Sequence, residues 1–204
     1  MEINELNRLL GNVDIYLLDQ ILKGRFTKEM RILDAGCGEG RNAVYFIQKE
    51  YQIFGIDPNE LAIQYCRYLA KSLNPEFDSH RFQVGKLEEI PFHTGSFEAV
   101  ICSAVLHFAE SVDNFWQMIL EIHRVLKPGG IFWFRMTTAF GGILAQSQDL
   151  GEGKYALPDG SERFIFLPDY VDKLEKIGFR LLEPMKTVLI PGQREMGIVI
   201  MEKI

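Results

Sequence analysis

The sequence contains few of the residues that build disulfide-bonded or metal-binding domains. Only three cysteines and four histidines occur among its 204 residues. Cys37, Cys66 and Cys102 lie far apart and form no C-x-x-C pair, which favours reduced thiols over a secreted disulfide scaffold. The histidines are equally scattered, so we predict no metal site.

Long apolar runs and blocks of basic residues are also missing. No stretch approaches the ~20 apolar residues of a transmembrane helix, and the opening MEINELNRLL is acidic and polar, unlike a signal peptide. The formal net charge is -6, which disfavours a nucleic-acid partner because phosphate binding relies on clustered lysine and arginine. We therefore expect a soluble, cytoplasmic protein with neither a membrane nor a nucleic acid as partner. The oligomeric state stays open.

What the sequence does contain is an alternation of short apolar runs and amphipathic segments. Since 47% of the residues are hydrophobic, the chain can bury one core, and we expect a single domain over residues 1–204. Apolar runs at 31–36 and 51–57 flank a helical pattern, which predicts a βαβ unit with parallel strands. Further strands are predicted at 80–85, 97–105, 131–136, 179–184, 186–190 and 196–201, and further helices at 61–69, 112–126 and 167–177. Together they predict a doubly wound α/β sheet that ends in an antiparallel hairpin.

Two segments stand outside this alternation. Apolar residues recur every three or four positions from Ile3 to Leu22, which predicts one amphipathic helix and an N-terminal helical cover over residues 1–24. From 137 to 167 the regular pattern lapses, and a structureless connection of this length is typical of a lid or binding loop. We predict a substrate lid there, in which Phe140, Tyr155, Phe164 and Phe166 either line an acceptor pocket or anchor the loop.

The stretch ILDAGCGEGRN, residues 32–42, places three glycines two positions apart at the first strand-to-helix turn. In a doubly wound sheet this turn belongs to the ligand crevice, and glycines there present backbone amides without a Cβ in the way. Asp57 ends the second strand, where a carboxylate accepts hydrogen bonds from a ribose diol. Both NAD and an adenosyl cofactor have such a diol. Arg41 stands where a dinucleotide fingerprint wants glycine or alanine, which weakens the NAD interpretation.

From about residue 31 to 136 the sequence resembles the class I S-adenosylmethionine-dependent methyltransferases, especially the small-molecule subgroup called methyltransferase type 11. The resemblance rests on four motifs in their order: LDAGCGEGRN, GIDPNE, FQVGKLEEIPFHTGSFEAVICSAVLHF and EIHRVLKPGGIFWF. It implies a Rossmann-like, mostly parallel seven-stranded sheet of order 3-2-1-4-5-7-6 with strand 7 antiparallel.

The resemblance also implies S-adenosylmethionine as cofactor and a set of residues that bind it. Gly36 and Gly38 would lie along its methionine part, and Ser103 beside the methionyl group. Asp57 would bind the ribose, and the turn from Lys86 to Glu88 would flank the adenine. The predicted cofactor-binding residues are Asp34, Gly36, Gly38, Arg41, Asp57, Lys86, Leu87, Glu88 and Ser103.

Lys86 departs from the family pattern. The family usually carries an aspartate there, which accepts a hydrogen bond from the adenine amino group, whereas an ammonium only donates. Either Lys86 turns away and Glu88 or a backbone carbonyl accepts that bond, or adenine binds weakly.

Methyl transfer from a sulfonium requires mainly orientation and electrostatics from the protein. His107, just past the fourth strand, is the predicted catalytic residue because a neutral imidazole accepts a proton near pH 7; alternatively, it bonds the backbone at a strand end. Arg135 either steers an anionic substrate or makes a surface ion pair. Arg41 either helps to hold the cofactor carboxylate or is a solvated helix residue.

The sequence thus predicts an S-adenosylmethionine-dependent methyltransferase that acts on a small-molecule acceptor. An NAD-linked oxidoreductase is one alternative, although no hydride-transfer constellation is recognisable. A catalytically silent S-adenosylmethionine-binding protein is another, motivated by Lys86.

Overall fold

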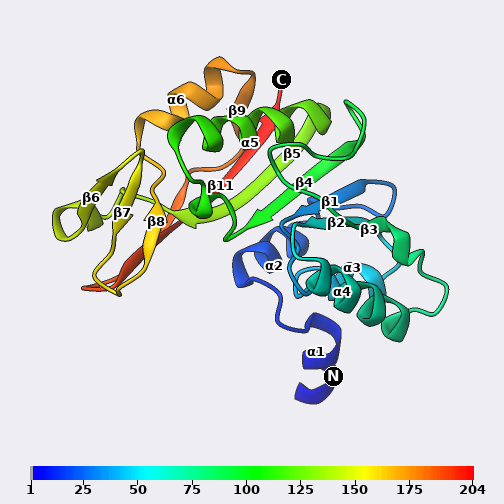
Figure 1. Ribbon diagram of the computed structural model, residues 1–204. Helices are drawn as coiled ribbons and strands as arrows, with labels where there is room; N and C mark the ends of the chain where they lie inside the picture. Colours follow the sequence, from blue (N-terminus) through cyan, green and yellow to red (C-terminus); the bar gives the residue numbers. More distant parts are fainter. Residues whose placement is uncertain (1) are drawn as a thin grey trace.

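Residues 2–204 are described by a computed structural model, which shows a large twisted sheet with helices on both faces. Figure 1 shows α5 and α6 on one face and α2, α3 and α4 on the other, with a small second sheet at one end. Within residues 2–204, no helix is both long and apolar enough to cross a membrane.

The strands of the large sheet agree closely with those predicted. Their order is β10 (Lys186–Ile190), β11 (Arg194–Lys203), β5 (Leu126–Thr137), β4 (Phe97–Ser103), β1 (Arg31–Ala35), β2 (Gln52–Asp57) and β3 (Phe82–Val84), and β9 (Phe179–Leu181) also pairs with β11. As predicted, β11 runs antiparallel to β5, whereas β5, β4, β1, β2 and β3 are parallel.

The edge of this sheet corrects the predicted strand count. Among residues 2–204 the sheet contains eight strands rather than seven. β9 pairs with residues 201–203 of β11 and β10 with residues 194–198, so both occupy the position expected for strand six. Each is too short to cover the ten residues of β11 alone.

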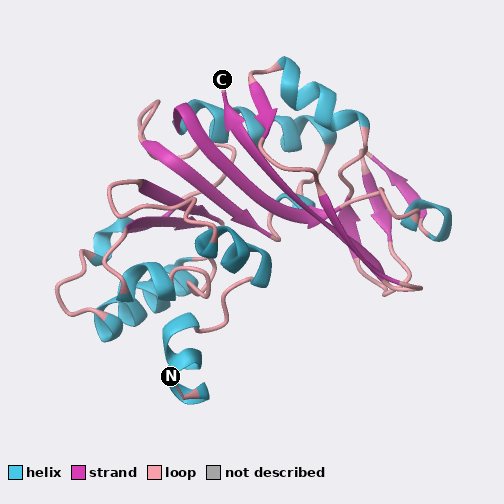
Figure 2. Cartoon of the chain, turned by 180° about the vertical axis from the view of Figure 1, so that it is seen from behind, coloured by secondary structure: helices cyan, strands magenta, loops and turns pink. Residues whose placement is uncertain are grey.

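Alternate residues of each strand feed two separate cores, as expected of strands covered on both sides. Phe132, Phe134 and Met136 of β5 face the core under α5 (Val112–Val125) and α6 (Asp169–Lys176). Trp133 faces the opposite core, under α2 (Ile15–Leu22), α3 (Val44–Gln48) and α4 (Glu60–Leu73). Figure 2 shows the twist of this two-sided sheet from behind.

The N-terminal cover is two helices rather than the one predicted. α1 (Ile3–Leu10) ends at Gly11, which adopts φ +59°, and α2 begins after Asp14, whose carboxylate accepts a hydrogen bond from the Tyr16 amide at 3.0 Å. None of the residues of α1 is buried, whereas Leu17 of α2 belongs to the core. The sheet is therefore covered by α2, and α1 lies outside it (Figure 1).

The segment 137–167 was predicted to be a structureless connection, but it contains three short strands. β6 (Gln148–Gly151), β7 (Lys154–Ala156) and β8 (Glu162–Phe164) form a small antiparallel sheet. Phe164 and Phe166 are fully buried in the core under α5, where Phe164 stacks on Phe115 with ring centroids 4.8 Å apart. These aromatic side chains therefore anchor the segment.

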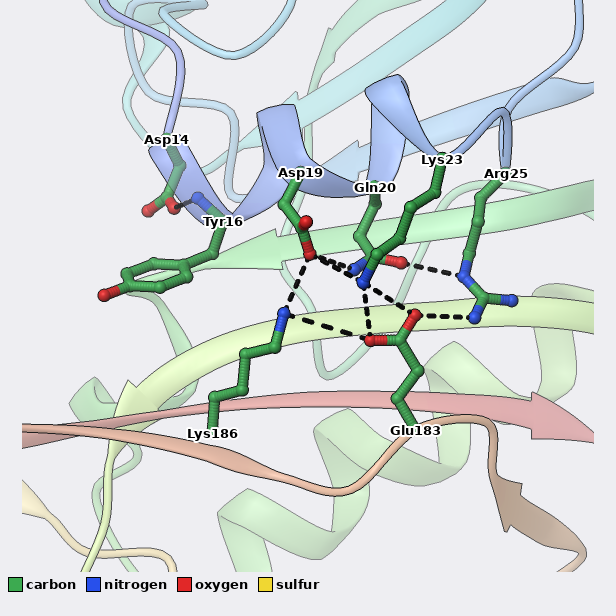
Figure 3. Close-up of polar contacts among 8 residues, drawn as sticks. All are labelled: Asp14, Tyr16, Asp19, Gln20, Lys23, Arg25, Glu183 and Lys186. Carbon is green, nitrogen blue, oxygen red and sulfur yellow. Dashed lines mark hydrogen bonds and ion pairs between the residues drawn. The ribbon is translucent and has the colours of Figure 1, made fainter.

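A network of ion pairs joins α2 to the C-terminal segment (Figure 3). Asp19 Oδ2 lies 2.8 Å from Lys186 Nζ and 2.9 Å from Lys23 Nζ. The Glu183 carboxylate forms ion pairs with Lys23 Nζ at 2.9 Å and with Arg25 Nη2 at 2.7 Å. The two lysines lower the pKa of Asp19 from 3.8 to about 2. The network connects the predicted N-terminal cover to a segment more than 150 residues later.

Asp19→Asn should lower the free energy of unfolding at pH 7 by less than about 1 kcal/mol, because the pairs of Asp19 are partly exposed and screened. A carboxylate with a depressed folded pKa stabilises above its unfolded pKa and loses this effect as the pH falls from about 3.8 towards about 2. Urea titrations at pH 7 and pH 3, with Glu152→Gln as a control outside the network, measure the difference. Equal stability of Asp19→Asn and the parent at pH 7 and low salt would contradict it.

Candidate active site

The glycine loop after β1 is held against β2 and against the loop after β4. The amides of Gly36 and Cys37 donate to the Ile56 carbonyl at 2.8 and 2.9 Å. Gly36 has φ +80°, and a Cβ there would approach Val105 to 2.4 Å. A Cβ on Gly38 would meet no atom of residues 2–204 within 4 Å, although φ is +52°. Gly36 is therefore required by packing, whereas Gly38 borders open space.

Asp57 supports this loop and keeps spare acceptor capacity. Its Oδ2 accepts from the Gly38 amide and its Oδ1 from the Asn59 amide, each at 2.9 Å. A carboxylate oxygen has about two acceptor positions, so each oxygen retains one. Two free acceptor positions at the end of β2 suit a vicinal diol.

A pocket of about 580 Å³ opens beside this loop. It is lined by Gly36, Asp57, Pro58, Lys86, Leu87, Glu88, Ala104, Val105, Phe108, Glu110 and Met118. Of the predicted cofactor-binding residues, Gly36, Asp57, Lys86, Leu87 and Glu88 come together here. Asp34, Gly38, Arg41 and Ser103 lie outside this lining. Sequence reasoning missed Val105, Phe108 and Met118, whose apolar character alone could not distinguish them from core residues.

The turn from Lys86 to Glu88 has one buried and two polar lining residues. Leu87 is only 3% exposed and belongs to the core under α5, so it fixes the turn. Glu88 Oε1 accepts from Asn114 Nδ2 at 2.9 Å, while its Oε2 has no hydrogen-bond partner among residues 2–204. Lys86 is exposed. Glu88 therefore offers an acceptor where Lys86 cannot.

Asp34, at the carboxyl end of β1, is a buried carboxyl group with unmet hydrogen-bonding capacity. It is 1% exposed, and neither of its oxygens has a partner among residues 2–204. Burial raises its pKa from 3.8 to about 7, although the positive charge of Arg41 opposes this rise. A buried carboxylate without partners is costly, so a donor or cation beside it would be stabilising.

Asp14 contacts three residues that the sequence analysis singled out: Arg41, Ser103 and Arg135. Its Oδ2 lies 2.8 Å from Arg135 Nη1, 3.3 Å from Ser103 Oγ and 3.8 Å from Arg41 Nη2, and its side chain is 1% exposed. Ser103 Oγ also accepts from Arg41 Nη2 at 3.0 Å. Arg135 thus makes the ion pair predicted as one alternative, but a largely buried one. An aspartate directly before an apolar helical run signals an N-cap, which the unbroken periodicity of residues 3–22 concealed.

A second pocket, of about 180 Å³, shares Ala104 with the first. It is lined by Ala104, His107, Arg135, Thr137, Leu157, Asp159, Ser161, Arg163, Arg194 and Met196. Ala104 has φ +59°, a conformation uncommon for non-glycine residues that is found preferentially at functional sites. His107, the predicted catalytic residue, and Arg135, the candidate for steering an anionic substrate, both line this second pocket.

His107 is buried and neutral in this position. Its side chain is 6% exposed, and its Nδ1 lies 3.3 Å from Thr137 Oγ1. Burial, then the charges of Arg163, Arg135 and Arg194, lower the pKa of His107 from 6.5 to about 4. The imidazole is therefore unprotonated at neutral pH and able to accept a hydrogen bond or a proton.

Cys37, in the glycine loop, is not an activated nucleophile. It is 6% exposed, and the neighbouring thiol of Cys66 together with burial raises its pKa far above the usual range. Its small side chain fills the space beside Gly55, where an added Cβ would approach the Cys37 sulfur to 2.9 Å.

Comparison with known proteins identifies the family to which this site belongs. The family described as "Methyltransferase domain" matches residues 33–134, half of the chain. The chain belongs to this methyltransferase family. The predicted resemblance to class I S-adenosylmethionine-dependent methyltransferases is confirmed, as are the Rossmann-like fold and S-adenosylmethionine as the cofactor of the family.

Similar proteins agree with this assignment. Human thiol S-methyltransferase TMT1A is 33% identical over 52% of the chain and 42% of its own length. The sterol 24-C-methyltransferase erg6 of Schizosaccharomyces pombe is 28% identical over 75% of the chain and 40% of its own length. The chain thus covers less than half of each relative. A SAM-dependent methyltransferase from Methanosarcina mazei shares the fold, with TM-score 0.69 and 22% identity over 90% of the chain and 97% of that protein.

The residues present fit an adenosyl cofactor. Asp57 offers two free acceptor positions for a ribose diol, Glu88 Oε2 is a free acceptor in the same pocket, and Asp34 has buried oxygens without partners. Gly38 leaves open space beside the loop. Asp57 would hold the ribose and Glu88 the adenine. Asp34 and the loop at Gly38 would hold the aminoacyl end of S-adenosylmethionine.

Asp57→Ala should weaken binding of S-adenosylhomocysteine by at least about tenfold, because hydrogen bonds to a charged acceptor contribute ~1.5–3 kcal/mol each. Isothermal titration measures the affinity, and circular dichroism checks that the fold persists. Asp57→Asn, which keeps one oxygen, should bind with intermediate affinity. Unchanged affinity of folded Asp57→Ala would refute the ribose assignment.

If Glu88 accepts the adenine hydrogen bond, Glu88 contributes to cofactor affinity and Lys86 contributes little. Glu88→Ala should weaken binding of S-adenosylhomocysteine by about tenfold, whereas Lys86→Ala should leave the affinity within about twofold. Titration of both variants beside the parent decides this. If only Lys86→Ala lost affinity, Glu88 would not be the compensating acceptor.

Proposed function

We propose that the chain transfers a methyl group from S-adenosylmethionine to a small-molecule acceptor. The family assignment supports the reaction type. The observation that carries the proposal is that two pockets, one with the predicted ribose-binding carboxylate Asp57 and one with the buried His107, share Ala104.

The two pockets have different tasks in this proposal. S-adenosylmethionine supplies an activated methyl group on a sulfonium, so the protein contributes chiefly positioning and electrostatics. Gly36, Asp57 and Glu88 hold and orient the cofactor in the larger pocket. The smaller pocket binds the acceptor, and neutral His107 accepts a hydrogen bond or proton from its nucleophilic atom.

The segment 137–167 forms part of the acceptor pocket, and the N-terminal cover supports one residue of its wall. Leu157, Asp159, Ser161 and Arg163, which line it, all belong to that segment, and this supports its role as a substrate lid within a single domain of residues 1–204. Asp14, in the cover over residues 1–24, holds Arg135 of the pocket wall. A cytoplasmic location and the absence of nucleic-acid and membrane partners remain predictions.

A catalytically silent cofactor-binding protein is the second candidate, because Lys86 removes the usual adenine acceptor. Binding alone does not separate the two functions, whereas turnover does. The first experiment is calorimetric titration of the protein with S-adenosylhomocysteine and, in parallel, NADH. Binding of the first alone supports the proposal, and binding of NADH alone favours the oxidoreductase alternative.

His107→Ala should slow turnover much more than it weakens cofactor binding. A positioned base contributes ~10²–10⁴-fold, and one with a pKa far below the working pH is expected near the lower end, so we expect about a 100-fold decrease in kcat. Formation of S-adenosylhomocysteine from S-adenosylmethionine, measured on a panel of acceptors, gives the rate. His107→Gln, which keeps a partner for Thr137, is the structural control; full activity of either variant would return His107 to a purely structural role.

A further inference from the structure

The acceptor pocket is positively charged, in contrast to the protein as a whole. Arg135, Arg163 and Arg194 all line it, and Asp159 is the carboxylate among its lining residues. Asp14 neutralises Arg135 from behind, at 2.8 Å. Three arginines therefore face two aspartates, which leaves one positive charge unmatched in a protein of net charge -6.

The arginines come from three different parts of the chain. Arg135 lies on β5, Arg163 on β8 and Arg194 at the start of β11. Among residues 2–204, neither Arg163 nor Arg194 has a carboxylate oxygen within the 4.0 Å of an ion pair. Like charges brought together in this way repel one another, so a bound anion would stabilise the arrangement.

Arg163 is positioned between the two pockets. Its guanidinium lies 4.9 Å from the ring centroid of Phe108, which lines the larger pocket, and its Nη1 donates to the Glu162 carbonyl at 2.6 Å. These contacts occupy one face and one nitrogen of the guanidinium, so other donors stay free. A guanidinium with free donors binds a carboxylate in a bidentate manner.

The pocket is small, and two of its lining residues are buried apolar side chains. Leu157 and Met196 are 5% and 9% exposed, and the pocket volume is about 180 Å³. Such a space admits a compact molecule rather than a long chain, because ligand pockets for drug-sized molecules are about 300–1,000 Å³.

We infer that the methyl acceptor is a compact organic monoanion whose carboxylate is bound by Arg163 and Arg194. This inference rests on the proposed function, since it concerns the acceptor pocket of that reaction. The single unmatched positive charge suits a carboxylate, and Arg135, already bound to Asp14, contributes to the field rather than to a direct contact. The nucleophilic atom then lies towards Ala104 and His107, where the two pockets join.

The test compares benzoate with benzamide, which has the same shape without the charge. Both are titrated into protein saturated with S-adenosylhomocysteine, and affinity is measured by calorimetry. Benzoate should bind at least about tenfold more tightly, a factor that corresponds to about 1.4 kcal/mol. Equal affinity of the two compounds, or failure of benzoate to bind, would overturn the inference.

Variants assign the effect to the two arginines. The double variant Arg163→Gln/Arg194→Gln should bind benzoate as weakly as benzamide, whereas Arg180→Gln, an exposed arginine on β9, should behave as the parent. Persistence of the preference for benzoate in the double variant would also overturn the inference. The proposed function is tested separately by cofactor titration and by formation of S-adenosylhomocysteine on a panel of acceptors. Benzoate is also titrated into the cofactor-free protein, so that failure of one proposal is distinguishable from failure of the other.

Discussion

The arrangement of the site depends on the buried ion pair between Asp14 and Arg135. The Asp14 carboxylate caps α2 and pairs with Arg135 on the central strand β5, and it is also hydrogen-bonded by Ser103 on the neighbouring strand β4. Removing one partner of a buried ion pair costs about 3–5 kcal/mol, because the other charge is left uncompensated. Asp14 therefore ties the N-terminal helices to the sheet at the edge where both pockets open.

This arrangement follows from the pleat of the strands. Leu33, Val100 and Phe134 face the core under α5, so their sequence neighbours Asp34, Ile101 and Arg135 face the side of α2. Polar residues replace apolar ones on that side only at the carboxyl ends of the strands, which are the usual ligand-binding edge of a doubly wound sheet. Each of these polar residues directly follows a residue whose side chain is packed in the core. Packing of the apolar residue therefore fixes the position of the polar one.

The elements that were predicted correctly are those whose stability is decided locally. The strands from β1 to β5 and the helices α4 and α5 have strong apolar patterns, and the glycine loop and Asp57 have a recognisable spacing. The break between α1 and α2 was missed because the apolar periodicity continues across it, although Gly11 and Asp14 are local signals for a helix end and a helix start. The small sheet was missed because β6 is exposed along its whole length and β7 and β8 have three residues each, so neither alternation nor an apolar run marks them.

The two pockets also differ in how well local sequence patterns predict them. Five predicted residues line the larger pocket because its parts come from consecutive strand ends, which motifs record. The smaller pocket is assembled from the loop after β4, the end of β5, the turn between β7 and β8, and the start of β11, and no short motif spans these segments. Its arginines nevertheless affect the chemistry directly, since they help to keep His107 neutral and would hold an anionic acceptor beside it. The same arginines would therefore bind the carboxylate and, by adding to the effect of burial in lowering the pKa of His107, leave the imidazole able to accept a hydrogen bond from the nucleophilic atom.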